Sequence, residues 1–135
     1  MIIKKINHDQ TYPIRHQVMW PEQDLDYVKL KDDEKALHFA IEEDEDLQAV
    51  VSLFINHQKA QLRKLATKPN YRNRSFASNL ITHCISIAKA NMCKEIWLNS
   101  RSSKISFYQR FGFESTPEQF NKGGFNYTIM KLKLH

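Results

Sequence analysis

Apolar residues recur at helical spacing directly after residue 75, and this is the clearest pattern in the chain. Positions 76, 80, 84, 87 and 88 are apolar, and Ile81 and Ile85 widen the stripe. Such a stripe is typical of a helix that buries one face, and its length predicts about four turns. We expect this helix to end near Asn91.

Shorter apolar runs predict strands. They cover residues 1–6, 36–41, 49–56, 59–67 and 95–98, a segment that begins at 113, and residues 125–134. Two further helices are expected over residues 9–20 and 102–111. Trp20 precedes a proline and stops the first of these, and Gly112 provides a left-handed C-cap for the second.

Polar segments separate these elements. Residues 22–35 predict a loop or a short helix, and residues 42–46 and 121–124 predict turns. The strands on either side of the first turn predict an antiparallel hairpin. The order of elements predicts a single domain over residues 1–135, in which helices are layered on a mixed, largely antiparallel sheet. The fold class is therefore α/β (α+β).

In the strand at residues 59–67, the alternation of apolar residues between the two faces is interrupted. Ala60 and Leu62 share one face, but Leu65 lies on the other face. Because a strand alternates faces with period two, the switch predicts a bulge near Arg63 and Lys64. A bulge would expose backbone N–H and C=O groups to a ligand. The alternative is an ordinary strand that is half buried on both faces.

Charge is divided unevenly along a chain whose net charge is +5. Residues 22–46 carry 11 Asp and Glu against 3 Lys and Arg, a balance of −8. Residues 47–94 carry 8 Lys and Arg and no acidic residue, a balance of +8. This polarity favours an anionic ligand at the middle of the chain, although two solvated faces without a partner would give the same pattern.

Composition excludes several classes. Cys84 and Cys93 form no CxxC pair and lack paired histidines, so neither a metal site nor a disulfide framework is expected. No apolar run approaches the ~20 residues that cross a bilayer, and the first residues lack the features of a signal peptide. We therefore expect a cytoplasmic protein without metal or membrane contact.

The segment PNYRNRSFASNL, at residues 69–80, leads into the long helix with two arginines and no glycine. Helix N-termini attract phosphates, because their first amides lack partners and the helix dipole is positive there. The segment is therefore a phosphate cradle or a basic, solvated turn.

Three segments, taken in order, resemble the GNAT superfamily of acetyl-CoA-dependent N-acetyltransferases. They are residues 61–77, residues 97–101 and residues 107–113, which read FYQRFGF. The matching pattern covers roughly residues 49–134, and residues 14–23 resemble the first helix of one bacterial branch. The resemblance implies a sheet of about six to seven strands flanked by about four helices.

The resemblance also implies a coenzyme site. The family's phosphate loop follows the pattern Gln/Arg-x-x-Gly-x-Gly/Ala, with Ser75 here at the first glycine and Ala77 at the second position. The backbone amides of this loop would face the pyrophosphate, and its arginines would add charge-assisted hydrogen bonds. The residues concerned are Arg72, Asn73, Arg74, Ser75, Phe76 and Ala77. If Ser75 adopts a positive φ, its Cβ brings strain.

Further roles follow from the same resemblance. The backbone of Leu65, Ala66 and Thr67 would pair with the pantetheine arm, and an N–H near Leu65 would hold the oxyanion. Tyr108 would donate a proton to the departing thiolate, because a phenol with a pKa near ~10 stays protonated at neutral pH. The alternative for Tyr108 is a packed aromatic. Asn99 would contact the coenzyme or cap the following helix.

The implied activity is acetyl transfer from acetyl-CoA to a primary amine by direct attack in a ternary complex, without a metal. The acceptor would be a small-molecule or peptide amine that enters between residues 15–20 and 118–126, and the acidic segment favours a cationic one. The general base is not identified. Its candidates are His16, His38, His57, Glu118 and a relaying water.

Two other functions fit parts of the sequence. An acyl-CoA-binding regulatory or interaction module would keep the fold without catalysis, and the missing loop glycines favour it slightly. A nucleic-acid-binding domain would suit a pI near 9.2. It is disfavoured because the aromatic residues follow core periodicities rather than alternating with cations. A monomer and a homodimer are both compatible with the sequence.

Overall fold

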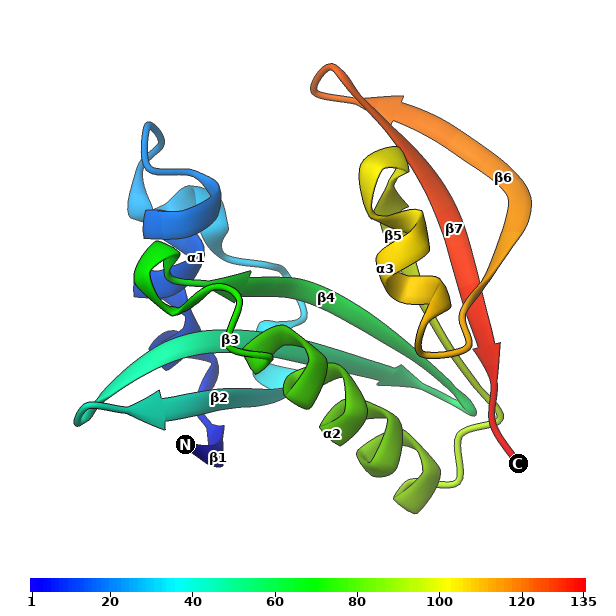
Figure 1. Cartoon of the computed structure of the whole chain (residues 1–135), viewed down its shortest axis with the longest axis horizontal. Helices are drawn as coiled ribbons and strands as arrows, with labels where there is room; N and C mark the ends of the chain where they lie inside the picture. The colour runs from blue at the N-terminus through cyan, green and yellow to red at the C-terminus, as the bar shows by residue number, and fades with distance from the viewer. The chain divides into compact units, whose positions relative to one another are not determined.

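A computed structural model describes residues 1–135 of the chain. The chain forms two compact units: the first combines Met1–Phe54 with Leu62–Cys84, and the second combines Ile55–Gln61 with Ile85–His135. Seven strands form a sheet in the order β1-β2-β3-β4-β5-β7-β6 (Figure 1). The strands are β1 Ile2–Ile6, β2 Leu37–Glu43, β3 Asp46–Asn56, β4 Lys59–Thr67, β5 Glu95–Arg101, β6 Glu114–Lys122 and β7 Phe125–Lys133. The α-helices are α1 Tyr12–Met19, α2 Phe76–Ala90 and α3 Ile105–Gln109.

The predicted fold class is confirmed: helices accompany a mixed sheet in which β4 and β5 form a parallel pair. Three α-helices are present where about four were expected. The polar residues 22–35, predicted as a loop or a short helix, form two short 3-10 helices, η2 Leu25–Val28 and η3 Asp33–Lys35. They have no apolar stripe that could bury a longer helix. The single domain over residues 1–135 stays a prediction.

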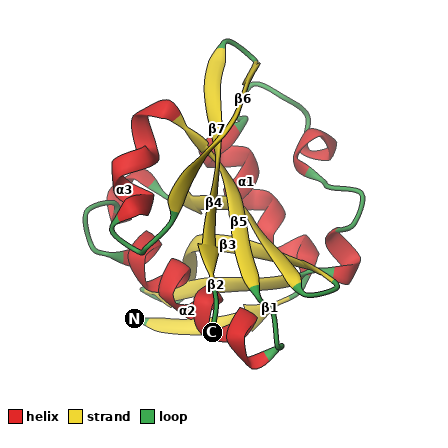
Figure 2. Cartoon of the chain, turned by 90° about the vertical axis from the view of Figure 1, so that its right-hand side faces the viewer, coloured by secondary structure: helices red, strands yellow, loops and turns green.

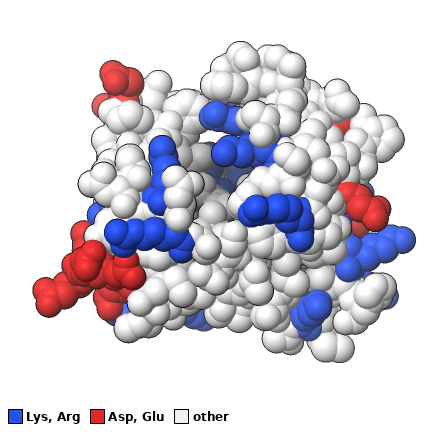
Figure 3. All heavy atoms as spheres, viewed as in Figure 1, with Lys and Arg blue, Asp and Glu red and all other residues white.

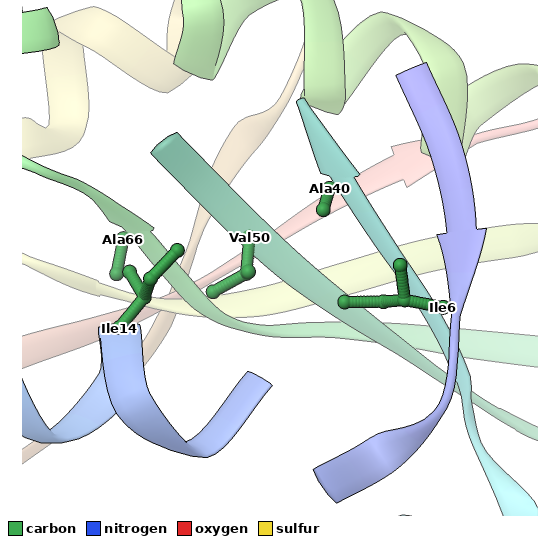
Figure 4. Packing of buried hydrophobic residues seen from close by; sticks show 5 residues of the cluster. All are labelled: Ile6, Ile14, Ala40, Val50 and Ala66. Carbon is green, nitrogen blue, oxygen red and sulfur yellow. The ribbon is translucent and has the colours of Figure 1, made fainter. Parts of the chain in front are cut away.

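In the first unit, α1 and the start of α2 cover opposite faces of the strands. Ala40 belongs to the core cluster that contains Ile14 of α1, and Figure 4 shows both side chains in that cluster. The neighbouring residue Phe39 contacts His83 of α2 edge-on, with ring centroids 4.6 Å apart. Because consecutive strand residues point to opposite faces, the two helices lie on opposite faces of β2.

In the second unit, β5, β7 and β6 are joined by antiparallel ladders, which twist strongly in the β6–β7 hairpin (Figure 2). The hairpin turn is formed by Gly123 and Gly124, whose φ angles of 57° and 82° suit a tight turn. Gly112 ends the turn after α3 with φ of 97°, as the sequence predicts. The buried residues Ile96, Leu98, Phe113 and Met130 form the apolar interior.

Strand β4 belongs to both units. Its first residues, Lys59–Gln61, pair in parallel with Glu95–Trp97 of β5, whereas Leu62–Thr67 are part of the first unit. Lys64 has φ of 56°, far from the extended backbone of a strand. The backbone irregularity therefore lies where the switch in alternation predicts it.

Candidate functional site

Helix α2 begins at an exposed turn in the first unit. The carbonyl of Ser75 accepts a hydrogen bond from the N–H of Asn79 at 2.9 Å, so Ser75 is the N-cap. The amides that follow it have no partner within the helix. Residues 72–75 are exposed, and Phe76 is buried and anchors the first turn. This geometry presents the positive end of a 15-residue helix to solvent.

Two residues of this turn have left-handed backbones. Asn73 has φ of 63° and Ser75 has φ of 65°. The condition for strain at Ser75 is therefore met, since a side chain in this region costs about 1–2 kcal/mol. Asn73 tolerates the conformation better. The turn therefore has backbone dihedral angles that are typical of glycine, although it contains no glycine.

The cations of the turn are largely engaged by the tip of the β2–β3 hairpin. Arg74 donates to Oε2 of Glu43 at 2.7 Å, and Lys68 contacts Oδ2 of Asp46 at 3.2 Å. Arg72 makes a longer contact, 3.4 Å from its Nε to the carbonyl of Thr67. Figure 3 shows the acidic side chains of the tip gathered beside basic ones. The acidic and basic runs of the sequence therefore neutralise each other in part.

The predicted pantetheine strand lies in the same unit as the turn. Ala66 is only 3% exposed, and its side chain lies beside Ile14 in the core (Figure 4). Leu65 and Thr67 are half-buried. The Ala66 side chain is therefore committed to the core and is not available to a ligand.

Tyr108 and Asn99 belong to the second unit. The Tyr108 ring, on α3, packs edge-on against Phe107 and Phe113 at centroid distances of 5.2 and 6.1 Å. Burial raises the pKa of Tyr108 to about 12, so its hydroxyl is protonated at neutral pH. Asn99 is exposed on β5. It caps no helix, because the N-caps after β5 are Arg101 and Lys104.

The candidate bases are not gathered at one place. His38 is buried, and its ring nitrogens contact Oγ of Ser52 at 2.6 Å and the carbonyl of Asp33 at 2.7 Å. Burial lowers the pKa of His38. The ring of His16 contacts the carbonyl of Gln23 at 2.6 Å. Both His57 and Glu118 are exposed.

Sequence reasoning missed a buried ionic network around Arg15. Arg15 is 0% exposed and donates two hydrogen bonds to the carboxylate of Asp33, at 2.8 and 2.9 Å. It also donates to Oγ of Ser52 at 2.9 Å and to the carbonyl of Val28 at 3.0 Å. Nothing in the helical periodicity marks this arginine, because arginines on helices are mostly exposed.

The structure contains no group of three or more His, Cys, Asp or Glu side chains that could hold a metal ion. None of its helices combines the length and the apolar composition that a membrane span requires. Cys84 and Cys93 are buried, free thiols.

Comparison with known proteins gives consistent matches. The sequence model of the acetyltransferase (GNAT) family matches residues 3–113. The uncharacterized N-acetyltransferase YitI of Bacillus subtilis is 27% identical over 140 residues, which cover 97% of this chain and 94% of that protein.

Solved structures share the whole fold. A putative N-acetyltransferase from Lactobacillus plantarum has a TM-score of 0.86 at 16% identity and full coverage of both chains, 100% each. An acetyltransferase of Bacillus subtilis, solved in complex with CoA, has a TM-score of 0.75 at 19% identity over 98% of both chains.

Proposed function

The chain belongs to the GNAT acetyltransferase family, and we propose that it transfers an acetyl group from acetyl-CoA to a primary amine by direct attack in a ternary complex. The observation that carries this proposal is the exposed entrance of α2, where two left-handed residues, Asn73 and Ser75, precede the first turn of the helix. The related Bacillus subtilis structure with bound CoA supports the choice of donor.

The pyrophosphate of the coenzyme would lie at this entrance. The amides of Asn73, Arg74, Ser75, Phe76 and Ala77 supply donors at the positive end of the helix dipole. Arg72 would add a charge-assisted hydrogen bond, because its present contact with a carbonyl is long and easily exchanged.

The pantetheine arm would pair with the backbone of β4 at Leu65, Ala66 and Thr67, as an added strand does. The left-handed backbone at Lys64 supports this role, because such an irregularity redirects the peptide groups that follow it. The N–H of Leu65 would then stabilise the negative charge on the carbonyl oxygen during attack. Asn99 is proposed as a further contact to the coenzyme.

Tyr108 is the proposed general acid. The amine nitrogen forms a bond to the carbonyl carbon, the carbon–sulfur bond breaks, and the Tyr108 hydroxyl gives its proton to the sulfur. A pKa of about 12 keeps that proton in place until the thiolate forms. The proton lost by the amine goes to water or to a base that is assigned to no residue. His38 is a poor candidate, because both its ring nitrogens are engaged.

The acceptor is proposed to be a small-molecule or peptide amine. The acidic segment is weaker support for a cationic acceptor than the sequence indicates, because Glu43 and Asp46 are paired with Arg74 and Lys68. Arg15 is fully buried and does not line an entrance for the acceptor.

The test is acetyl-CoA turnover across a panel of primary amines, with Tyr108→Phe as the variant. Loss of the proton donor should lower kcat by about a hundredfold and leave the KM for acetyl-CoA nearly unchanged. Tyr127→Phe, which removes another phenol from the same unit, serves as the control. An unchanged kcat in Tyr108→Phe would remove Tyr108 from the acid role.

One alternative keeps the fold and the coenzyme without catalysis, as an acyl-CoA-binding regulatory module. The strained Ser75 and the engaged Arg74 favour it. CoA binding without turnover of any amine in the panel would support this function instead.

A further inference from the structure

The turn before α2 needs support from outside itself. Residues 69–80 contain no glycine, yet both Asn73 and Ser75 have positive φ. Strained residues of this kind persist only where their surroundings hold them in place. The neighbouring contacts therefore decide whether the turn keeps this backbone conformation.

Those contacts come from the tip of the β2–β3 hairpin. Glu43 binds Arg74 at 2.7 Å, and Asp44 accepts a hydrogen bond from the Tyr71 hydroxyl at 2.5 Å. The guanidinium of Arg74 lies over the Tyr71 ring, 4.9 Å from its centroid. That ring in turn stacks on Phe76, at a centroid distance of 5.9 Å. The carboxylates of Glu43 and Asp44 thus hold Arg74 and Tyr71, and the Tyr71 ring packs on Phe76, the first residue of α2.

The hairpin tip is itself well fixed. Glu43 pairs with Asp46 across the turn, and both turn residues, Asp44 and Glu45, have positive φ, of 55° and 64°. A two-residue turn of this kind matches the twist of its strands. The amino group of Met1 lies 3.7 Å from Oε1 of Glu43 and adds a second ionic contact.

We propose that Glu43 and Asp44 are positioning residues for acetyl-CoA: they brace Arg74 and Tyr71, and so hold the amides of residues 73–77 in the conformation that glycines would otherwise permit. The inference rests on the proposed function. This bracing role differs from simple competition, in which Glu43 would only pair with Arg74 and keep that cation from binding phosphate. Bracing predicts weaker coenzyme binding when the carboxylates are removed, and competition predicts tighter binding.

The experiment measures the dissociation constant of CoA by calorimetry for the full chain and for Glu43→Gln/Asp44→Asn. Loss of both contacts should raise the constant about fivefold. In a Ser75→Gly background, the same pair of substitutions should change it by less than about twofold, because glycine adopts the loop conformation without support. Glu45→Gln is the control, since it removes one negative charge from the exposed turn while Glu43 and Asp44 stay in place.

A second measurement needs no ligand. Amide hydrogen exchange at residues 72–77 of the free protein should be faster in the double variant than in Glu45→Gln. Unchanged exchange, or tighter CoA binding in the double variant, would overturn the bracing role. If the unmodified chain binds no CoA, the proposed function fails, and the exchange measurement still decides whether the hairpin holds the turn.

Discussion

Arg15 carries a permanent charge that has no exposed surface, and its neighbours compensate for it. Asp33 binds it through both carboxylate oxygens, and the Asp33 carboxylate also accepts a hydrogen bond from the N–H of Leu30 at 2.7 Å. Ser52 and His38 extend the network. Because a carbonyl only accepts, the Nε2 of His38 donates to the carbonyl of Asp33. Burial lowers the pKa of His38 and favours the neutral ring, whose Nδ1 then accepts from the Ser52 hydroxyl.

Removing one member of the ion pair should be costly. Asp33→Asn leaves the guanidinium of Arg15 buried without its counter-charge, and we expect a loss of about 3 kcal/mol in the free energy of unfolding. The neighbouring Asp32 is exposed, so Asp32→Asn should change that free energy by less than about 0.5 kcal/mol. Urea unfolding of both variants checks the difference. Equal losses of unfolding free energy in the two variants would show that the buried ion pair contributes no more to stability than an exposed carboxylate.

The same network predicts how stability depends on pH. The pKa of His38 is lowered in the folded protein, mainly by burial, so the unfolded chain takes up a proton first as the pH falls. This contribution is fully present above the unfolded pKa of about 6.5 and is lost as the pH falls below it. Burial opposes ionisation of Asp33, but the hydrogen bonds from Arg15 and the N–H of Leu30 outweigh it and lower the pKa of Asp33, which adds a second loss of stability below about pH 4. Unfolding free energies at pH 8, 6 and 5 should therefore decline, and His38→Gln should flatten the first decline relative to His57→Gln.

At the scale of elements, periodicity was a good guide where one face of an element is buried. The α2 stripe predicted a helix to about Asn91, and the helix ends at Ala90. The hairpin of β2 and β3 and the C-cap at Gly112 were predicted as well. Residues 22–35 were predicted only as a loop or a short helix, and the positions of the two 3-10 helices could not be predicted, because such helices bury isolated residues such as Val28 and Asp33 without a repeat. The start of α2 follows from the stripe that begins at Phe76, whereas the place of Ser75 at the first glycine position of the loop came only from the resemblance.

The end of α2 offers a stabilising substitution. The N–H of Cys93 bonds the carbonyl of Ala88 at 3.0 Å, and the N–H of Met92 bonds that of Lys89 at 3.0 Å, the pattern of a Schellman motif. Met92 occupies its left-handed position with φ of 62° and is 78% exposed. Met92→Gly should therefore raise the free energy of unfolding by about 0.5–1 kcal/mol. Met92→Ala keeps the Cβ and should show no gain, and a gain in both variants would point to another cause.

For the molecule as a whole, the order of the three segments that resemble the family predicted the family correctly. The distribution of charge was a weaker guide to the surface that a ligand would meet. The balance of +8 over residues 47–94 indicates an open cationic surface. In the folded first unit, Glu43 and Asp46 engage two of those cations, Arg74 and Lys68. Pairing between residues that are distant in the sequence cannot be read from local counts, because the register of the hairpin decides which side chains meet.

The two units share secondary-structure elements, and this affects how the chain unfolds on heating. Two strands and one helix run through both: β3 changes unit after Phe54, β4 after Gln61 and α2 after Cys84. Each unit therefore contains two separate stretches of the chain. Unfolding of either unit would remove residues that continue the strands and the helix of the other. We expect a single heat-absorption peak whose calorimetric enthalpy equals the van't Hoff enthalpy. Two separated peaks would mean that the stretches on either side of these crossings fold independently.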